Sequence, residues 1–318
     1  MMFFAVLDYL ALRARHVLLW GLALGILAGL VAPQMAEALQ WAVAPIVAIL
    51  LFLAVLRLGP EGVRAGLKGW RQGLLLVLIL QLMVPLAVVL AARGLGLEGA
   101  LLIGIVLVLA AAPITGGPNL AIMSGASGAV ALRQLVLGTA LLPITALPVF
   151  LLVPGLGPAS EVISIVLRLL MLIAAAGALG LWLRARGIIT GDASSLRMID
   201  GMATFLLGAI VIVLMGAVGP ALVSGLEGWG VLLLVLFLGF GMQTALLFAL
   251  RRHLPLTEVA ALSQAAGNRN VALLLGVLPL GMASELFLFI GLYQIPMYLT
   301  PAVMGWVYLR MGLARSAS

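Results

Sequence analysis

The chain contains no cysteine and very few charged side chains. The absence of cysteine excludes disulfides, thiolate nucleophiles and zinc–sulfur sites. Only 8% of the 318 residues are charged and 65% are apolar, whereas soluble domains average about 25% charged and about 45–50% apolar. The mean hydropathy is +1.31. These values exclude a soluble enzyme and a disordered protein, and they predict an integral membrane protein.

Histidines and catalytic motifs are also scarce. The two histidines, His16 and His253, both lie beside arginines at predicted helix ends, and neither an HExxH motif nor a pair of intramembrane aspartates occurs. We therefore expect no enzymatic activity and no cofactor, apart from a sodium ion. The net charge of +7 comes from arginines that flank apolar runs and do not form a basic face, so no nucleic-acid partner is expected.

Long apolar runs fill nearly the whole chain. None alternates with the two-residue period of a transmembrane strand, so each is expected to be a helix in contact with the lipid bilayer. About 20 apolar residues span a bilayer, and the sequence divides into ten such segments in one membrane domain, 1–318. The first follows Arg13, Arg15 and His16 and ends near Pro33, and the others cover about 38–57, 73–92, 99–124, 130–153, 162–183, 200–218, 230–250, 256–281 and 284–309.

The basic residues predict the orientation of these segments. With a cytoplasmic N-terminus, 13 of the 17 basic residues fall in inner segments and only Arg93 falls in an outer loop. Arg133, Arg168 and Arg269 lie within or at the edge of spans. Cytoplasmic loops carry an excess of Lys and Arg. We therefore expect a multi-pass protein of a bacterial-type cytoplasmic membrane with both termini in the cytoplasm.

Two of the ten spans contain segments that a continuous helix does not accommodate. The fourth contains Pro-Ile-Thr-Gly-Gly-Pro-Asn at 113–119, and the ninth contains Ala-Gly-Asn-Arg-Asn at 266–270. Prolines remove backbone donors and glycines permit unusual dihedral angles, so both helices are expected to be interrupted. The interruptions leave carbonyl groups that need partners at membrane depth.

The two interruptions occupy the same position in successive halves of five helices. Each is followed by two prolines five residues apart, Pro143 with Pro148 and Pro296 with Pro301. Two halves with an odd number of helices must insert in opposite orientations, which is typical of secondary transporters with broken helices. The sequence thus predicts inverted repeats at 1–153 and 159–318. The alternative is that prolines and glycines are simply common in membrane helices.

With these motifs the sequence resembles the bile acid:sodium symporter superfamily over nearly its whole length. The resemblance implies a panel domain of helices 1, 2, 6 and 7 and a core domain of helices 3–5 and 8–10, with helices 4 and 9 unwound where they cross. It also implies sodium-coupled transport of an organic anion, such as a bile acid or a pantoate-like carboxylate, which binds between core and panel.

Residue by residue, the resemblance implies sodium ligands at Asn119 and at Gln81. The family's helix-9 carboxylate and glutamine are replaced by Ala265 and Arg269, and a helix-5 hydroxyl ligand is replaced by Arg133. A guanidinium about 4 Å from sodium repels it by about 4 kcal/mol at an effective dielectric constant of about 20. These substitutions argue against sodium coupling in the family's manner.

Arg269 has two interpretations. It can act as a tethered cation that supplies the charge sodium brings elsewhere, with a similar role for Arg133, or it can cap the unpaired carbonyls where helix 9 unwinds. For Arg133 the alternative is a position near the cytoplasmic helix end, as the positive-inside rule requires. The remaining candidates for the binding site are small or polar residues at the interruptions: Thr115, Gly116, Gly117, Gln264, Asn268 and Asn270.

The sequence therefore predicts a secondary transporter of a small organic anion that works by alternating access. Sodium symport is the expectation from the resemblance. The alternatives are a sodium-independent uniporter or exchanger with Arg269 as its cation and, from another class, a membrane scaffold or sensor that transports nothing. No oligomeric state follows from the sequence.

Overall fold

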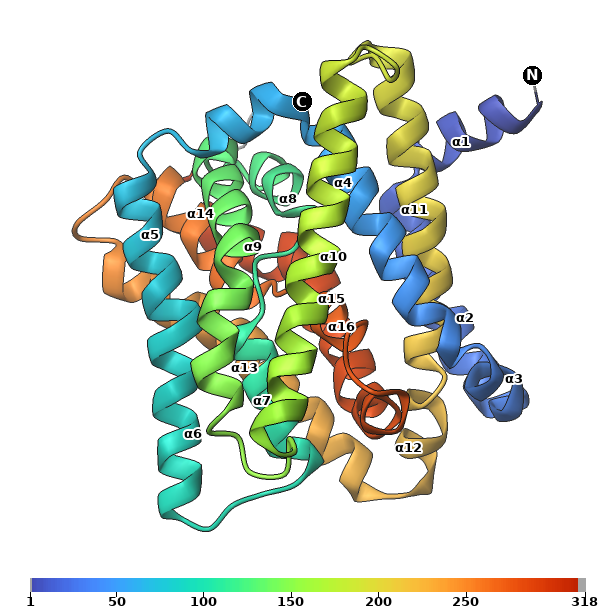
Figure 1. The fold of residues 1–318 in the computed structure, drawn as a ribbon, viewed down its shortest axis with the longest axis vertical. Coiled ribbons are helices and arrows are strands. Elements are labelled where there is room, and N and C mark those ends of the chain that lie inside the picture. Colours follow the sequence, from blue (N-terminus) through green and yellow to red (C-terminus); the bar gives the residue numbers. More distant parts are fainter. Residues whose placement is uncertain (1, 314–318) are drawn as a thin grey trace.

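The computed structural model describes residues 2–313, and every regular element in this part of the chain is a helix (Figure 1). Helices satisfy all backbone groups within one segment, which an apolar solvent requires. Among the described residues, seven segments are long and apolar enough to cross a membrane: Gln40–Gly66, Trp70–Gly94, Gly128–Phe150, Ala159–Ala185, Ala193–Ser224, Leu226–Leu250 and Leu280–Arg310. The prediction of an all-helical membrane protein is confirmed.

These segments contain the long helices of the fold. They are α4 (Val43–Gly66), α5 with α6 (Trp70–Leu78 and Val84–Gly94), α9 (Gly128–Phe150), α10 (Ala159–Ala185), α11 (Ala193–Met215), α13 (Leu226–Leu250) and α16 (Leu280–Arg310). The shorter helices are α1 (Met2–Leu12), α2 (Ala14–Val31), α3 (Pro33–Ala38), α7 (Ala100–Ala110), α8 (Gly117–Met123), α12 (Val218–Ser224), α14 (Leu256–Gly267) and α15 (Val271–Leu275).

The helices pack in two groups. In the first group, on the right of Figure 1, α2 packs on α11, and α4 packs on both α10 and α11. In the second group, α13 packs on α14 and α16, while α9 contacts α5, α8 and α14. The groups meet where α4 and α10 contact α9 and where α11 contacts α16. The interface between them therefore passes close to the middle of the molecule.

The loops rich in basic residues gather at one end of the molecule. The α4–α5 corner and the α10–α11 loop lie at the top of Figure 1, whereas the α6–α7 and α9–α10 loops lie at the bottom. The corner carries Arg64, Lys68 and Arg71, and Arg184 and Arg186 flank Ala185, the last residue of α10. The two ends thus differ in charge as the sequence predicts.

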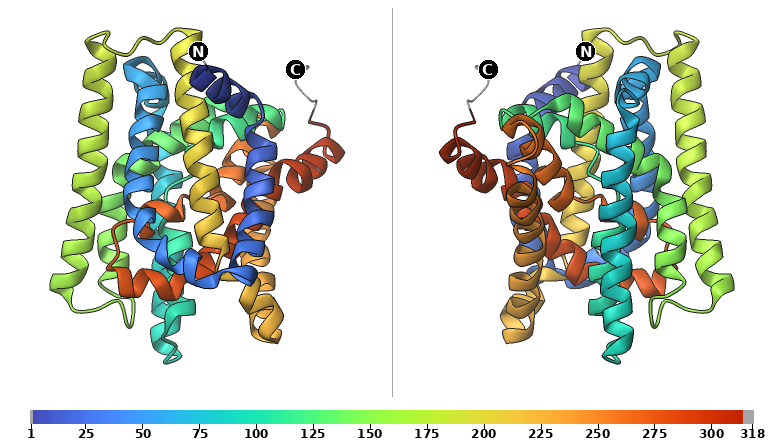
Figure 2. Two further views of the ribbon diagram at one scale, coloured as in Figure 1. Left: turned by 90° about the vertical axis from the view of Figure 1, so that its right-hand side faces the viewer. Right: turned by 90° about the vertical axis from the view of Figure 1, so that its left-hand side faces the viewer.

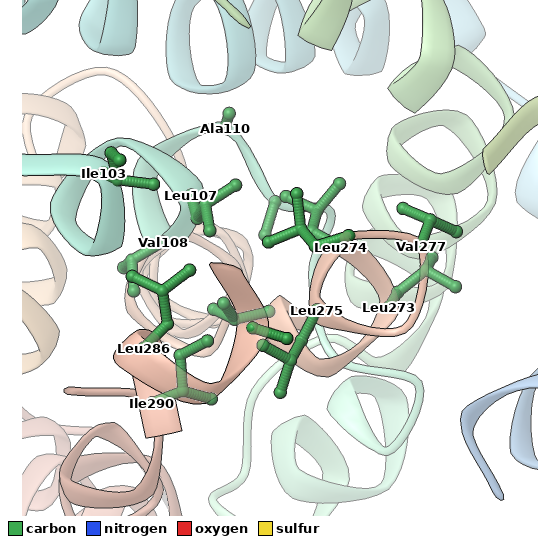
Figure 3. Packing of buried hydrophobic residues seen from close by; sticks show 14 of the residues in the cluster. Ile103, Leu107, Val108, Ala110, Leu273, Leu274, Leu275, Val277, Leu286 and Ile290 are labelled. Carbon is green, nitrogen blue, oxygen red and sulfur yellow. The ribbon is translucent and has the colours of Figure 1, made fainter. Parts of the chain in front are cut away.

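Apolar packing surrounds the short helices in the centre. Figure 3 shows Leu107 and Val108 of α7 beside Leu275 of α15 and Leu286 and Ile290 of α16. None of these side chains is more than 2% exposed. Lipid tails are as apolar as leucine, so this packing stabilises the fold through close contact and dispersion rather than through exclusion of water.

Candidate functional site

Two helical segments are interrupted where the sequence predicts, and the interruptions touch. The backbone leaves helical geometry between α7 and α8 and again between α14 and α15. There the Ile114 amide donates to the Asn268 carbonyl at 2.9 Å, and the Asn270 amide donates to the Ala112 carbonyl at 2.7 Å. These bonds form an antiparallel bridge between Pro113 and Arg269. Each interrupted segment thus satisfies backbone groups of the other.

The glycines of the first interruption do not use the dihedral freedom that glycine permits. Gly116 has ordinary right-handed dihedral angles (φ −75°, ψ −2°), and Gly117 is not among the glycines with positive φ. A Cβ at Gly116 would meet no atom within 4 Å, and one at Gly117 would meet only Ile114, at 3.9 Å. Neither glycine therefore has a positive φ. These glycines leave open space beside the backbone instead.

Arg269 lies at the centre of the contact between the two interruptions. Its side chain is 2% exposed and donates to three carbonyl oxygens. Nε donates to Ala266 at 2.8 Å, one terminal nitrogen donates to Ala111 at 3.0 Å, and the other donates to Leu80 at 3.4 Å. The guanidinium therefore joins the ends of α14 and α7 to the segment between α5 and α6.

The backbone explains why these carbonyls are available. Ala111 follows the last residue of α7, and the amide that would bond Ala266 in a continuous helix, that of Asn270, bonds Ala112 instead. Leu80 lies in a π-helical turn, Ile79–Met83, in which the Val84 amide donates to Ile79. The next amide position is Pro85, which has no N–H. The Leu80 carbonyl is thus left for Arg269.

Within residues 2–313, no carboxylate pairs with this buried charge. The ion pairs among the described residues join Arg57 to Asp200 and Arg197 to Asp8. Ala265, where the resemblance implies a carboxylate, is 7% exposed and carries no charge. The hydrogen-bond partners of the guanidinium among the described residues are thus carbonyl oxygens, and the site keeps a net positive charge.

A cavity of about 50 Å³ lies beside Arg269. Its polar lining comes from Thr115, Arg269, Asn270, Gln294 and Tyr298, and both α4 and α11 supply leucines. This volume holds about three or four water molecules. The cavity thus lies on the interface between the two helix groups and brings three of the predicted binding residues together.

Gln81 lies next to the same region but faces α9. It is 1% exposed, and its amide nitrogen donates to the Gly138 carbonyl at 3.1 Å, while its oxygen has no partner. A Cβ at Gly138 would lie 2.7 Å from the Pro113 ring, so α9 packs directly against the first interruption. Asn119, the other predicted sodium ligand, is exposed on α8. The structure thus leaves one predicted ligand buried and the other on the surface.

Arg133 and Gln264 lie outside the cavity lining. Arg133, in the second turn of α9, packs on the α4–α5 corner, where its guanidinium carbon is 3.1 Å from the position of a Cβ on Gly69. This places it near the basic loops of the upper end. Gln264 is 3% exposed on α14, and neither amide atom has a hydrogen-bond partner of good geometry.

A polar network that the sequence analysis missed holds the second interruption. The Tyr293 hydroxyl donates to the Gly267 carbonyl at 2.7 Å. The Thr300 hydroxyl is 2.9 Å from Asn268 Oδ1 and accepts from the amide of Gln243 at 3.0 Å. All four side chains are at most 1% exposed. Gln243 lies in an otherwise apolar helix, and burying an amide is costly unless it has a hydrogen-bond partner. Its position in the sequence could therefore have indicated a buried polar network.

The site contains no grouping typical of a resident metal. Within residues 2–313, no three His, Cys, Asp or Glu side chains come together in a way that could hold a metal ion. No protein-family model matches the chain, and no curated protein sequence matches it.

Proposed function

We propose that this protein is a secondary transporter of a small organic anion, with ten membrane crossings arranged as two inverted repeats. Ten crossings follow if α2, the α7–α8 segment and the α14–α15 segment each cross once, together with the seven longer segments. The antiparallel contact between the two interruptions supports this arrangement. So do the two prolines inside the helix after each interruption, in α9 and α16.

The observation that carries the proposal is a buried, uncompensated arginine beside a cavity between two helix groups. A carboxylate about 4 Å from a guanidinium gains about 4 kcal/mol at an effective dielectric constant of about 20, or about a thousandfold in affinity. Asn270, Thr115 and Gln294 add neutral hydrogen-bonding groups to the same cavity. A bile acid or a pantoate-like carboxylate carries the charge that this site lacks.

The small size of the cavity fits alternating access. Pockets for drug-sized ligands have volumes of about 300–1,000 Å³, much larger than the 50 Å³ present here. We infer that α2, α4, α10 and α11 act as a panel that moves against the remaining core helices to admit the substrate. The contact of α11 with α16 and of α4 with α15 lies along this boundary.

In this proposal, Arg269 takes the place of sodium. Its guanidinium already donates hydrogen bonds to three carbonyl oxygens that could otherwise bind a cation. Position 265 holds alanine, so the carboxylate that would bind sodium is absent there. Sodium-independent uniport or exchange is therefore the form of transport that the residues favour. Sodium symport, which the resemblance implies, would require oxygen ligands other than the three carbonyls that bond Arg269, located around Gln81.

The test is uptake of labelled carboxylates into proteoliposomes with sodium, potassium or a proton gradient. We expect wild-type uptake to be equal in sodium and potassium. Arg269→Gln should raise the half-saturating anion concentration by about a hundredfold or more, since the fixed charge is lost. Arg168→Gln is the matched control, because Arg168 is an exposed arginine on α10 and its loss should leave uptake unchanged.

Three results would contradict the proposal. Unchanged affinity in Arg269→Gln would leave that residue only a capping role. Steep sodium dependence of the wild type would return sodium to the mechanism. Absence of uptake for every carboxylate, with the protein correctly folded, would favour the membrane scaffold or sensor.

A double variant tests the link between Arg269 and sodium. Ala265→Glu with Arg269→Gln restores the acidic and amide residues that the resemblance implies for sodium binding. We expect this variant to become sodium-dependent, whereas Arg269→Gln alone should not. Sodium-independent uptake by the double variant would contradict the idea that Arg269 replaces the ion.

A further inference from the structure

A second, larger cavity lies apart from Arg269. It is an open groove of about 470 Å³ between α1, α2 and α11, and it shares no lining residue with the cavity at Arg269. The left view of Figure 2 shows α2 running beside α11, with α1 at the upper end. Gly21 and Gly208 both line it, and a Cβ on Gly21 would lie 3.5 Å from the Gly208 carbonyl oxygen. At these two positions no side chain fills the groove.

The groove is polar at one end and apolar along the rest. Tyr9, Arg13 and His16 line the end near α1, whereas Trp20, Leu24 and Phe205 line the remainder. Arg13 lies over the Tyr9 ring at 5.4 Å, and no ion pair involves it within residues 2–313. Asp8, an acid of the same region, pairs with Arg197 at 2.8 Å. The positive charge of Arg13 is thus available to an anion from outside.

The length of the groove matches one membrane leaflet. Arg13 and Leu24 are 11 residues apart along α2, which corresponds to about 16 Å at 1.5 Å per residue. One leaflet supplies half of the hydrocarbon thickness of about 30 Å. Trp20 is 67% exposed and Phe205 is 61% exposed, so aromatic rings border the opening. A cation at one end and an apolar channel of leaflet length are complementary to a lipid with an anionic headgroup.

We propose that this groove binds one anionic phospholipid, with its phosphate at Arg13 and His16 and one acyl chain between α2 and α11. Phosphate accepts hydrogen bonds from arginine in a planar, two-point geometry. The acyl chain covers Leu24 and Phe205 and fills the space above the two glycines. The lipid would join α1 to the helix pair α2–α11, which forms one edge of the first helix group.

The test measures lipid retention by the full-length protein with native mass spectrometry. Phosphatidylglycerol and phosphatidylcholine with identical acyl chains are offered in turn. We expect the wild type to retain one phosphatidylglycerol in preference to phosphatidylcholine and to lose that preference at high salt, where exposed charges are screened. Arg13→Gln should weaken phosphatidylglycerol retention about fivefold, as the loss of one basic contact to an anionic lipid predicts.

Two further variants separate this site from general lipid contact. Arg310→Gln is the matched control, because Arg310 also lies over an aromatic ring, that of Trp306 at 5.1 Å, but outside the groove. It should retain phosphatidylglycerol as the wild type does. Ala209→Trp places a large ring in the groove and should reduce retention of both lipids.

Several outcomes would overturn the proposal. These are equal retention of the two lipids by the wild type, an unchanged preference in Arg13→Gln, or an equal loss in Arg310→Gln. Unchanged retention in Ala209→Trp would place the lipid elsewhere. A mass of two chains without lipid, abolished by Ala209→Trp, would assign the groove to a second copy of the protein.

Discussion

The two interruptions solve the same backbone problem in different surroundings. The first, between α7 and α8, is only partly buried from Ile114 onward, with open space at Gly116 and an exposed Asn119. The second, between α14 and α15, is enclosed, with Asn268 and Arg269 at most 2% exposed. Its backbone is held by Tyr293 and its side chains by Thr300. The first interruption thus leaves open space beside its backbone, and the second holds the charge of Arg269 in a fixed position.

This difference shows how a membrane protein keeps an arginine in its centre. The N–H groups of the guanidinium need hydrogen-bond acceptors that lipid tails do not supply, and the unpaired carbonyls of broken helices need hydrogen-bond donors. Both needs are met when Arg269 bonds carbonyls from three segments. If the second interruption changed its conformation, the guanidinium and the three carbonyls would lose their hydrogen bonds. We therefore expect Arg269 to supply most of the stabilisation where the two interruptions meet.

The largest expected effect comes from Arg269→Leu. This change leaves the carbonyls of Ala111, Ala266 and Leu80 without their donor, and each unpaired buried group costs about 1–3 kcal/mol. The variant no longer has to bury a charge, which offsets part of this cost. We therefore expect the free energy of unfolding to fall by about 3 kcal/mol. Thermal unfolding in detergent measures it. An equal loss in Arg168→Leu, on exposed α10, would show that arginine removal alone causes the effect.

A smaller loss of stability is expected when a methyl group is added to α9 where this helix packs against the first interruption. Gly138→Ala puts a methyl group 2.7 Å from the rigid Pro113 ring, and such overpacking costs about 1–3 kcal/mol. Gly116→Ala is the matched variant, because its methyl group meets no atom within 4 Å. It should leave stability unchanged or raise it by less than about 1 kcal/mol. Equal losses in both variants would contradict the open space assigned to Gly116.

Thr300→Val tests the network behind the second interruption. The variant keeps the side-chain shape but removes the hydroxyl that contacts Asn268 and Gln243. We expect a loss of about 1–2 kcal/mol, since two buried amides lose a partner. Thr145→Val is the control, because that hydroxyl bonds only carbonyls of its own helix, Leu141 and Leu142. A loss in the control as large as that in Thr300→Val would remove the special role of the network.

The smallest effect concerns a helix end in water, for comparison with those in the membrane. Asp192 caps α11, and the hydrogen bond from Thr190, followed by the Ser195 amide, lowers the pKa of its carboxyl to about 2 from 3.8. A depressed pKa means that this stabilisation is present above pH 3.8 and is lost as the pH falls toward 2. The protection of the Ser195 amide, measured as its exchange rate relative to the intrinsic rate at the same pH, should therefore decrease below pH 3.8. Asp192→Asn should abolish this pH dependence, and an unaltered profile would contradict the cap.

Several features of the site were predictable because they depend on local chemistry. Pro113 and Pro118 cannot continue a helix, and Asn268, Arg269 and Asn270 are unsuited to a lipid-facing turn, so the positions of both interruptions follow from residue types. Arg269 is a charge in an apolar segment, which made it a candidate at once. Gly116 and Gly117 lack positive φ, since glycine permits unusual dihedral angles without requiring them.

Other features depend on neighbours distant in the sequence. The Leu80 carbonyl is free because of a π-helical turn before Pro85, and its distance from Arg269 is a property of the packed helices. Nothing in the order of residues places Thr300 against Asn268 or Arg13 at the end of a groove. The placement of Asn119 on the surface and of Gln81 inside likewise depends on how α8 and the α5–α6 segment dock.

The amino-acid sequence alone determined the solvent of this protein, its helical class, the charge difference between its ends and the two places where helices must stop. These follow from composition and backbone chemistry, which act within a few residues. Only the tertiary structure decided that the two interruptions pair with each other and that one arginine serves carbonyls from three segments. The reason is that hydrogen-bond partners in an apolar interior are chosen by packing, over separations of up to 189 residues.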